Sequence, residues 1–250
     1  MSHPLEKVRV QMKRFVAALT SLSLLSVWSG GASAATLPSN LKGLSASQIA
    51  NLSLTSAHVE GSCTNVSVGK ATGFTFGSST NSGRLDAQEE LTINQAIGVV
   101  RLVKGALFTK ESNQIIRLQF GISDPKYANK WISIPRSSKH YVPFSSGLTF
   151  ASMIAQVRPA GKLTESKVGT LHEVKVIAIN GTANVELGLS TGAETLFVSD
   201  TSPYLPVELA ASGRSQGVPT TLVVTFSHWG QPFTYAAPAG AIPISSTNLP

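Results

Sequence analysis

The feature that most constrains the fold of this chain is an alternation of apolar and polar residues in its last third. In the segment 222–228, Leu222, Val224 and Phe226 share one side of an extended chain. The segments 171–179 and 204–210 show the same period of two. Successive short strands with this pattern are typical of an antiparallel sheet with one face covered by the rest of the protein.

The middle of the chain mixes strand and helix patterns. Short runs rich in Val, Ile, Phe and Thr predict further strands at 55–60, 72–77, 83–87, 90–94, 97–103, 105–109 and 131–134. A tight hairpin is expected at Lys104-Gly105. Helices are predicted over 45–52, 111–120 and 148–157, where Ser45, Gly121 and Pro159 supply start or stop signals. We therefore expect an α+β fold, a curved antiparallel β-sheet (a half-open barrel) with a few helices packed on its concave face.

The first 34 residues have the order of a secretory signal peptide. Basic residues up to Arg14 precede an apolar run, and Ala32-Ser-Ala34 forms an A-x-A cleavage site. The apolar run is shorter than the roughly 20 residues that span a bilayer. We expect a signal peptide at 1–34, a single domain at 35–250, and a location outside the cytoplasmic membrane. The alternative is an uncleaved amphipathic helix or membrane anchor.

The charge of the chain does not indicate nucleic-acid binding. The whole sequence carries a net charge of +7, and the part after residue 34 keeps 16 basic and 12 acidic residues, a net charge of +4. These basic residues are scattered singly, whereas a nucleic-acid site needs a concentrated patch.

Motifs of catalysis are weak or absent in the sequence. Gly213-Arg-Ser-Gln-Gly217 matches the nucleophile elbow of hydrolases, but no Asp or Glu follows Glu208, and a second predicted strand follows the motif. An ordinary β-turn is the better interpretation. The histidines after the signal peptide are far apart in sequence, and Glu89 and Glu90 should face opposite sides of a strand. We predict no enzyme activity, no cofactor and no metal site.

Cys63 is the one cysteine of the chain, so an intramolecular disulfide is excluded. The simplest interpretation is a small buried side chain at the end of a strand. An intermolecular disulfide or a reactive thiol is the alternative.

Several segments of the chain resemble a known family of envelope proteins. The segments are Ser56–Gly61, Trp131-Ile-Ser-Ile-Pro135, Glu194–Asp200, Pro203-Tyr-Leu-Pro-Val-Glu-Leu209, Val223–Pro232 and Ala237-Pro238. They are similar to the LolA-like / LppX–LprG-like (lipo)proteins of actinobacteria. The resemblance implies a half-open barrel that encloses a hydrophobic cavity, and characterised relatives carry lipoproteins or acylated glycolipids. Many relatives have a lipobox cysteine, which this sequence lacks.

The segment 111–157 contains more apolar and aromatic residues than a few short helices need. They either fill the space between helices and sheet or line a cavity there, since ligand pockets are concave and mostly apolar. We predict a lipid or acylated glycolipid as ligand. The alternative is a structural or partner-binding module with a filled interior. The candidate cavity residues are Ile116, Phe120, Trp131, Phe144, Leu148, Ala151, Ile154, Ala155, Val176 and Phe226.

Overall fold

A computed structural model describes residues 37–244, except 73, 121–123, 139, 185–186 and 216. The predicted signal peptide and the last six residues therefore lie outside the described residues. Within them, no helix is both long and apolar enough to cross a membrane.

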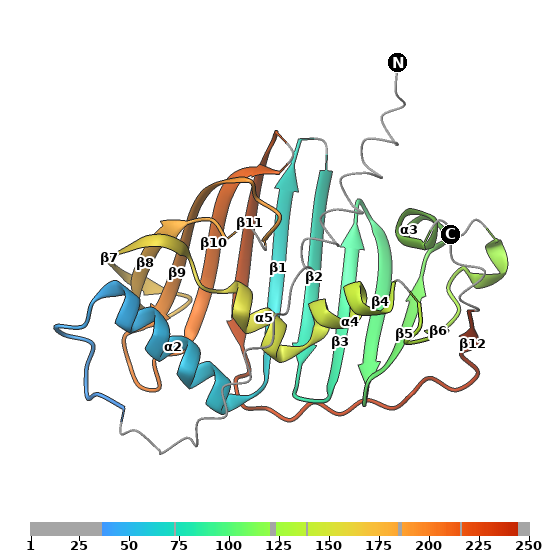
Figure 1. Cartoon of the computed structure of the whole chain (residues 1–250), viewed down its shortest axis with the longest axis horizontal. Helices are drawn as coiled ribbons and strands as arrows, with labels where there is room; N and C mark the ends of the chain where they lie inside the picture. The colour runs from blue at the N-terminus through green and yellow to red at the C-terminus, as the bar shows by residue number, and fades with distance from the viewer. Residues whose placement is uncertain are drawn as a thin grey trace.

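The architecture is one curved, unclosed sheet in the order β12-β6-β5-β4-β3-β2-β1-β11-β10-β9-β8-β7 (Figure 1). Neighbouring strands are antiparallel, apart from the short parallel pair β12 and β6. The expected fold class is confirmed. The strands are β1 (Cys63–Ala71), β2 (Phe74–Ser82), β3 (Asp86–Ile93), β4 (Ala96–Val103), β5 (Ala106–Glu111), β6 (Ile132–Ile134), β7 (Ala160–Leu171), β8 (Val174–Thr182), β9 (Thr191–Ser199), β10 (Pro206–Ser215), β11 (Val218–Ser227) and β12 (Ile242–Pro243).

The helices lie on the concave face of this sheet, where α2, α5, α4 and α3 follow one another across it (Figure 1). Their bounds are α2 (Ala46–Glu60), α3 (Asn113–Phe120), α4 (Tyr141–Leu148) and α5 (Phe150–Gln156), with a short 3₁₀ helix η1 (Pro125–Tyr127). After β11, residues 228–241 run along one end of the sheet to β12 (Figure 1).

Some of the predicted elements are corrected by the structure. The segments 83–87 and 90–94 are not two strands, because residues 83–85 connect β2 to β3 and β3 is unbroken from Asp86 to Ile93. The segment 55–60 is the second half of α2, because the helix continues from its Ser45–Gln48 capping box to a left-handed C-cap at Gly61. The segment 148–157 is not one helix: α4 ends at Leu148, and Thr149 is the N-cap of α5. The strand predicted over the family-like segment Ser56–Gly61 is therefore wrong.

The alternation that predicts the last strands is confirmed. Leu222, Val224 and Phe226 are buried on the concave side of β11, and Leu209 is buried on β10. The expected hairpin between β4 and β5 is also present, with positive φ at both turn residues, Lys104 and Gly105.

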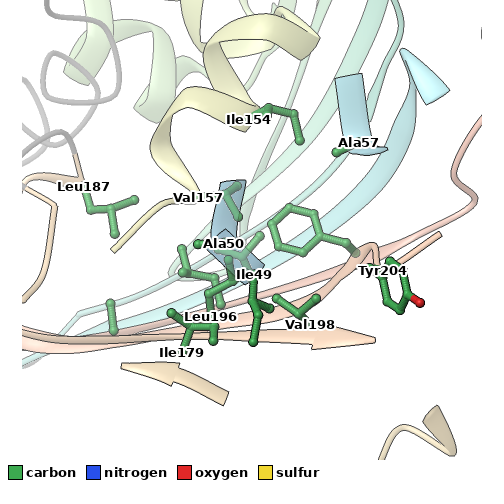
Figure 2. Packing of buried hydrophobic residues seen from close by; sticks show 14 of the residues in the cluster. Ile49, Ala50, Ala57, Ile154, Val157, Ile179, Leu187, Leu196, Val198 and Tyr204 are labelled. Atoms are coloured by element: carbon green, nitrogen blue, oxygen red, sulfur yellow. The ribbon is translucent and has the colours of Figure 1, made fainter. Parts of the chain in front are cut away.

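The interior contains two main clusters of buried apolar residues. The first lies between α2, α5 and the strands β8 to β11. Ile49 lies beside Ile179 and Leu196, and Ile154 of α5 belongs to the same cluster (Figure 2). The second lies under α3 and α4 at the other half of the sheet, around Phe120 and nearby strands β4 to β6. The strands β1 to β3 lie between these two clusters.

Candidate functional site

A cavity of about 140 Å³, partly open to solvent, lies over the middle of the sheet, between the two apolar clusters. Its floor is formed by β1, β2, β3, β10 and β11, and α4, α5 and the connection after β8 contribute the opposite wall. The lining is mostly apolar. It consists of Asn65, Ser67, Phe76, Ser78, Thr80, Glu89, Leu91, Ile93, Gly147, Met153, Gln156, Val157, Leu187, Leu209, Leu222, Val224 and Phe226.

The cavity exists because β1 and β2 present small side chains to the concave face. Asn65 and Ser67 line the cavity, whereas Val66 and Val68 on the same strand are 44% and 47% exposed on the convex face. This is the reverse of the usual arrangement, in which the apolar side of a strand faces the core. Small inward side chains leave space under the helices that larger residues would fill.

Gly69 continues this inward row and accommodates an aromatic ring. A Cβ atom at Gly69 would lie within 2.5 Å of the Phe76 ring, so the ring occupies the position above the glycine. Phe76 is the partner of Gly69 across the β1–β2 pair and lines the cavity. The glycine thereby fixes where this wall of the cavity lies.

Five polar side chains form a patch on the floor, here called the polar patch: Asn65, Ser67, Ser78, Thr80 and Glu89. Asn65 is paired with Thr80 across β1 and β2, and Thr80 with Glu89 across β2 and β3, so three of them form one row. The Thr80 hydroxyl lies 3.5 Å from Oε1 of Glu89. The row spans roughly 10 Å, since adjacent strands are about 4.8 Å apart.

A second acidic side chain is buried beside this row. Glu111 on β5 is 1% exposed and accepts a hydrogen bond of 2.6 Å from the Thr109 hydroxyl. Gly98 makes room for it, because a Cβ atom there would lie 3.0 Å from Cγ of Glu111.

Burial governs the protonation of both acids. It raises the pKa of Glu111 to about 8, opposed by the Thr109 hydrogen bond and assisted by the charge of Glu89. Burial also raises the pKa of Glu89, opposed by hydrogen bonds with Ser78 and Thr80. Glu90 points to the other side of β3 and is exposed, as the sequence predicts.

The other titratable candidates are dispersed. His172 is paired with Glu208 at 2.8 Å near the exposed β7–β8 turn, and His58 and His228 are exposed. Within the described ranges, no group of three or more His, Cys, Asp or Glu side chains is close enough to hold a metal ion. Ser215 ends β10 directly before the turn into β11, so the G-x-S-x-G motif lies in a hairpin and not between a strand and a helix.

Cys63 is fully buried at the start of β1, with its sulfur 4.0 Å from that of Met153. Burial raises the pKa of its thiol to about 12. The expected position, a small buried side chain at a strand end, is confirmed.

The ten residues predicted from the sequence to line a cavity are divided among several environments. Phe226 lines the cavity described above. Ile154 belongs to the first apolar cluster, and Val176 is buried on β8. Ile116, Phe120, Phe144 and Leu148 belong to the second cluster.

The remaining three candidates lie away from the cavity. Ala151 and Ala155 are on the exposed side of α5. The prediction places them on the inner side because it assumes one continuous helix over 148–157, whereas a new helix begins at Phe150. The Trp131 ring packs against the guanidinium of Arg101, whose Cζ atom lies 4.8 Å from the centre of the ring.

The polar patch is the part of the site that the sequence-based prediction misses. Its signal is the alternation Asn65-Val-Ser-Val-Gly69, which marks a strand but not which side of it faces inward. Assignment of the valines to the core would turn the polar side chains outward. The many Ser and Thr residues of β2 are the feature of the sequence that indicates a polar inner face.

A second hollow of about 290 Å³ lies near the β5–β6 edge, lined in part by Gly105, Arg136 and Tyr141. It is more open to solvent and has much less apolar surface. An apolar ligand is therefore better enclosed in the central cavity.

Comparison of the sequence with protein-family profiles and with curated proteins finds no match. Comparison with solved structures finds the crystal structure of LprF from Mycobacterium bovis, with a TM-score of 0.55 and 16% sequence identity. The alignment covers 78% of this chain and 97% of the LprF chain. The two chains share a fold. At this level of identity the similarity to LprF concerns the fold alone, and it agrees with the fold that the closing segments of the sequence imply.

Proposed function

We propose that this protein is an exported, non-enzymatic envelope protein that binds a lipid or another apolar ligand in the cavity between sheet and helices. A carrier role follows if the ligand is exchanged with membranes. The observation that carries the proposal is the central cavity, which is partly open to solvent and whose apolar lining includes Phe226, Leu222, Val224 and Met153. The shared fold with LprF and the family-like closing segments support a member of the LolA-like / LppX–LprG-like group without a lipobox cysteine.

The volume limits what the cavity holds in this conformation. About 140 Å³ is close to the roughly 150 Å³ of an engineered apolar cavity that binds benzene, and is below the 300–1,000 Å³ of ordinary ligand pockets. The described conformation thus accommodates the end of a hydrocarbon chain. Burial of each CH₂ contributes about 0.8 kcal/mol, so a longer chain gains more if α4 and α5 move outward.

Two adjacent serines on β2 test this proposal. Ser78 lines the cavity, whereas Ser79 is exposed on the opposite face. We expect Ser78→Phe to fill the cavity and to weaken binding of a fluorescent fatty-alcohol probe, and Ser79→Phe to bind like the unchanged protein. Native mass spectrometry of the protein purified from its envelope fraction should show a bound lipid that is absent from Ser78→Phe.

The alternative is a structural module, and the small volume together with the two filled clusters favours it. In that case no lipid co-purifies, and Ser78→Phe only overpacks the interior, at a cost of about 1–3 kcal/mol in unfolding free energy. The combination of the two measurements separates the two functions.

A further inference from the structure

The polar patch is an unusual floor for an apolar cavity. Asn65, Thr80 and Glu89 form a row across three central strands, with Phe226 beside Asn65 on β11 and Leu91 two residues beyond Glu89 on β3. Polar groups that line a cavity form hydrogen bonds with protein groups, with water or with a ligand.

Asn65 is the member of the row whose amide is open to the cavity. It is 6% exposed and lines the cavity, and no hydrogen bond joins its side-chain amide to another residue in the described part of the chain, so the amide is free to bind water or a ligand there. An amide presents both donors and an acceptor, so a group that both accepts and donates would satisfy it.

The charges around the polar patch indicate which ligand group binds the Asn65 amide. None of the residues that line the cavity in the described structure is Lys, Arg or His, and Glu89 is one of them. Glu111 is buried close enough to Glu89 for their charges to interact. A carboxylate or phosphate brought to this floor would lose its hydration at low local dielectric with no cation to balance its charge, and an ionised Glu89 would add repulsion.

We propose that the ligand carries an uncharged hydroxyl that binds the row Asn65–Thr80–Glu89, while its hydrocarbon lies against the apolar walls. The hydroxyl accepts from the Asn65 amide and donates to the Glu89 carboxyl group, so both are satisfied. The apolar part contacts Phe226, Val224 and Met153. The inference rests on the proposed function and adds to it a substrate class: fatty alcohols and monoacylglycerols, in preference to fatty acids and phospholipids.

Binding of 1-decanol and decanoate tests this preference, because the two have the same chain length and differ in the polar group. Displacement of a neutral apolar dye from the full exported chain at about pH 8, where decanoate is ionised, gives both affinities. We expect 1-decanol to bind about tenfold or more tightly than decanoate. Glu89→Gln should reduce that ratio by improving decanoate binding, and Glu90→Gln, on the opposite face of β3, should leave it unchanged.

Asn65→Leu provides a second variant that does not depend on charge. This variant should bind 1-decanol about tenfold more weakly than the unchanged protein and should bind decane equally well. Equal binding of 1-decanol and decanoate, or an Asn65→Leu variant that binds 1-decanol normally, would overturn the hydroxyl preference and leave the proposed function standing. Failure of decane, 1-decanol and the dye to bind at all would overturn both.

Discussion

At the scale of single residues, the buried acids make the protein sensitive to pH. The pKa of Glu111 is raised to about 8 and that of Glu194 to about 7, in both cases mainly by burial. An acid whose pKa is raised on folding binds more protons in the native state than in the unfolded one. The free energy of unfolding therefore falls as pH rises from the unfolded pKa through the folded pKa.

We predict that the unfolding free energy falls by several kcal/mol between about pH 5 and about pH 8. Glu111→Gln keeps an oxygen that accepts from Thr109 but removes the ionisation, so this variant should lose less stability over the same interval. Denaturant titrations at the two pH values measure the change. The control is Glu90→Gln, whose side chain is exposed; if its pH dependence is reduced as much as that of Glu111→Gln, the explanation is wrong.

Cys63 gives a second prediction at this scale. The thiolate is the reactive form of cysteine, and burial together with a pKa of about 12 keeps the thiol protonated and inaccessible. We expect negligible reaction with an aromatic disulfide reagent in the native protein and complete reaction after unfolding. Because the chain has one cysteine, the absorbance change reports Cys63 alone. Rapid labelling of the folded protein, or a covalent dimer in a non-reducing gel, would restore the alternative of a reactive or intermolecular thiol.

At the scale of elements, the sequence predicts strands well where apolar side chains face inward. The β11 alternation through Leu222, Val224 and Phe226 gives both the strand and its buried face. On β1 the same period places Val66 and Val68 outward, because hydrophobicity alone cannot tell which side of a strand meets the helices. The segment 55–60 is predicted as a strand because of its β-branched residues. The signals that make it part of α2 are the N-cap Ser45 and the C-cap Gly61, which lie far apart in the sequence and must be combined to define the helix.

The capping box of α2 yields a prediction at this scale. The Ser45 side chain accepts from the Gln48 backbone N–H, and the Gln48 side chain accepts from the Ser45 backbone N–H. Ser45→Ala should lower the unfolding free energy by about 1 kcal/mol, because two amide groups at the helix start depend on this exchange. Ser47→Ala changes an exposed serine in the first turn of the same helix and should have little effect. Thermal unfolding of the two variants side by side measures the difference, and equal midpoints would contradict the role of the cap.

At the scale of the whole molecule, the site exists because the two apolar clusters leave a space between them over the middle of the sheet. The residues expected to surround a cavity, such as Phe120 and Ile154, fill these clusters instead. The space lies between the clusters, over strands whose inner residues are small. A sequence shows which residues are apolar, but the position of a gap depends on the packing of segments as distant as Asn65, Met153 and Phe226. For this reason the fold class could be predicted, whereas of the predicted cavity residues only Phe226 is among those that line the cavity described here.

Export is the remaining prediction at this scale. We expect cleavage after Ala34 or Ala35, because small residues then occupy the positions one and three residues before the cut. Either cut would leave the folded body intact, because the hydroxyl of the buried Tyr204 donates to the carbonyl of Pro38, which lies after both positions. A chain that begins at residue 35 or 36 keeps this hydrogen bond.

N-terminal sequencing of the exported protein identifies the cut, and one variant distinguishes the two sites. In Ser33→Leu the large side chain is three residues before a cut after Ala35 but only two before a cut after Ala34. The variant should therefore abolish cleavage after Ala35 and preserve cleavage after Ala34. Replacement of both Ala32 and Ala34 by Leu should block cleavage after Ala34 and shift it to Ala35, because Ser33 and Ala35 still occupy the positions three and one before that cut. An exported chain that still begins at Met1 or Met12 would contradict the signal peptide, and the apolar run before Ala32 would then act as an anchor that holds the cavity close to the membrane.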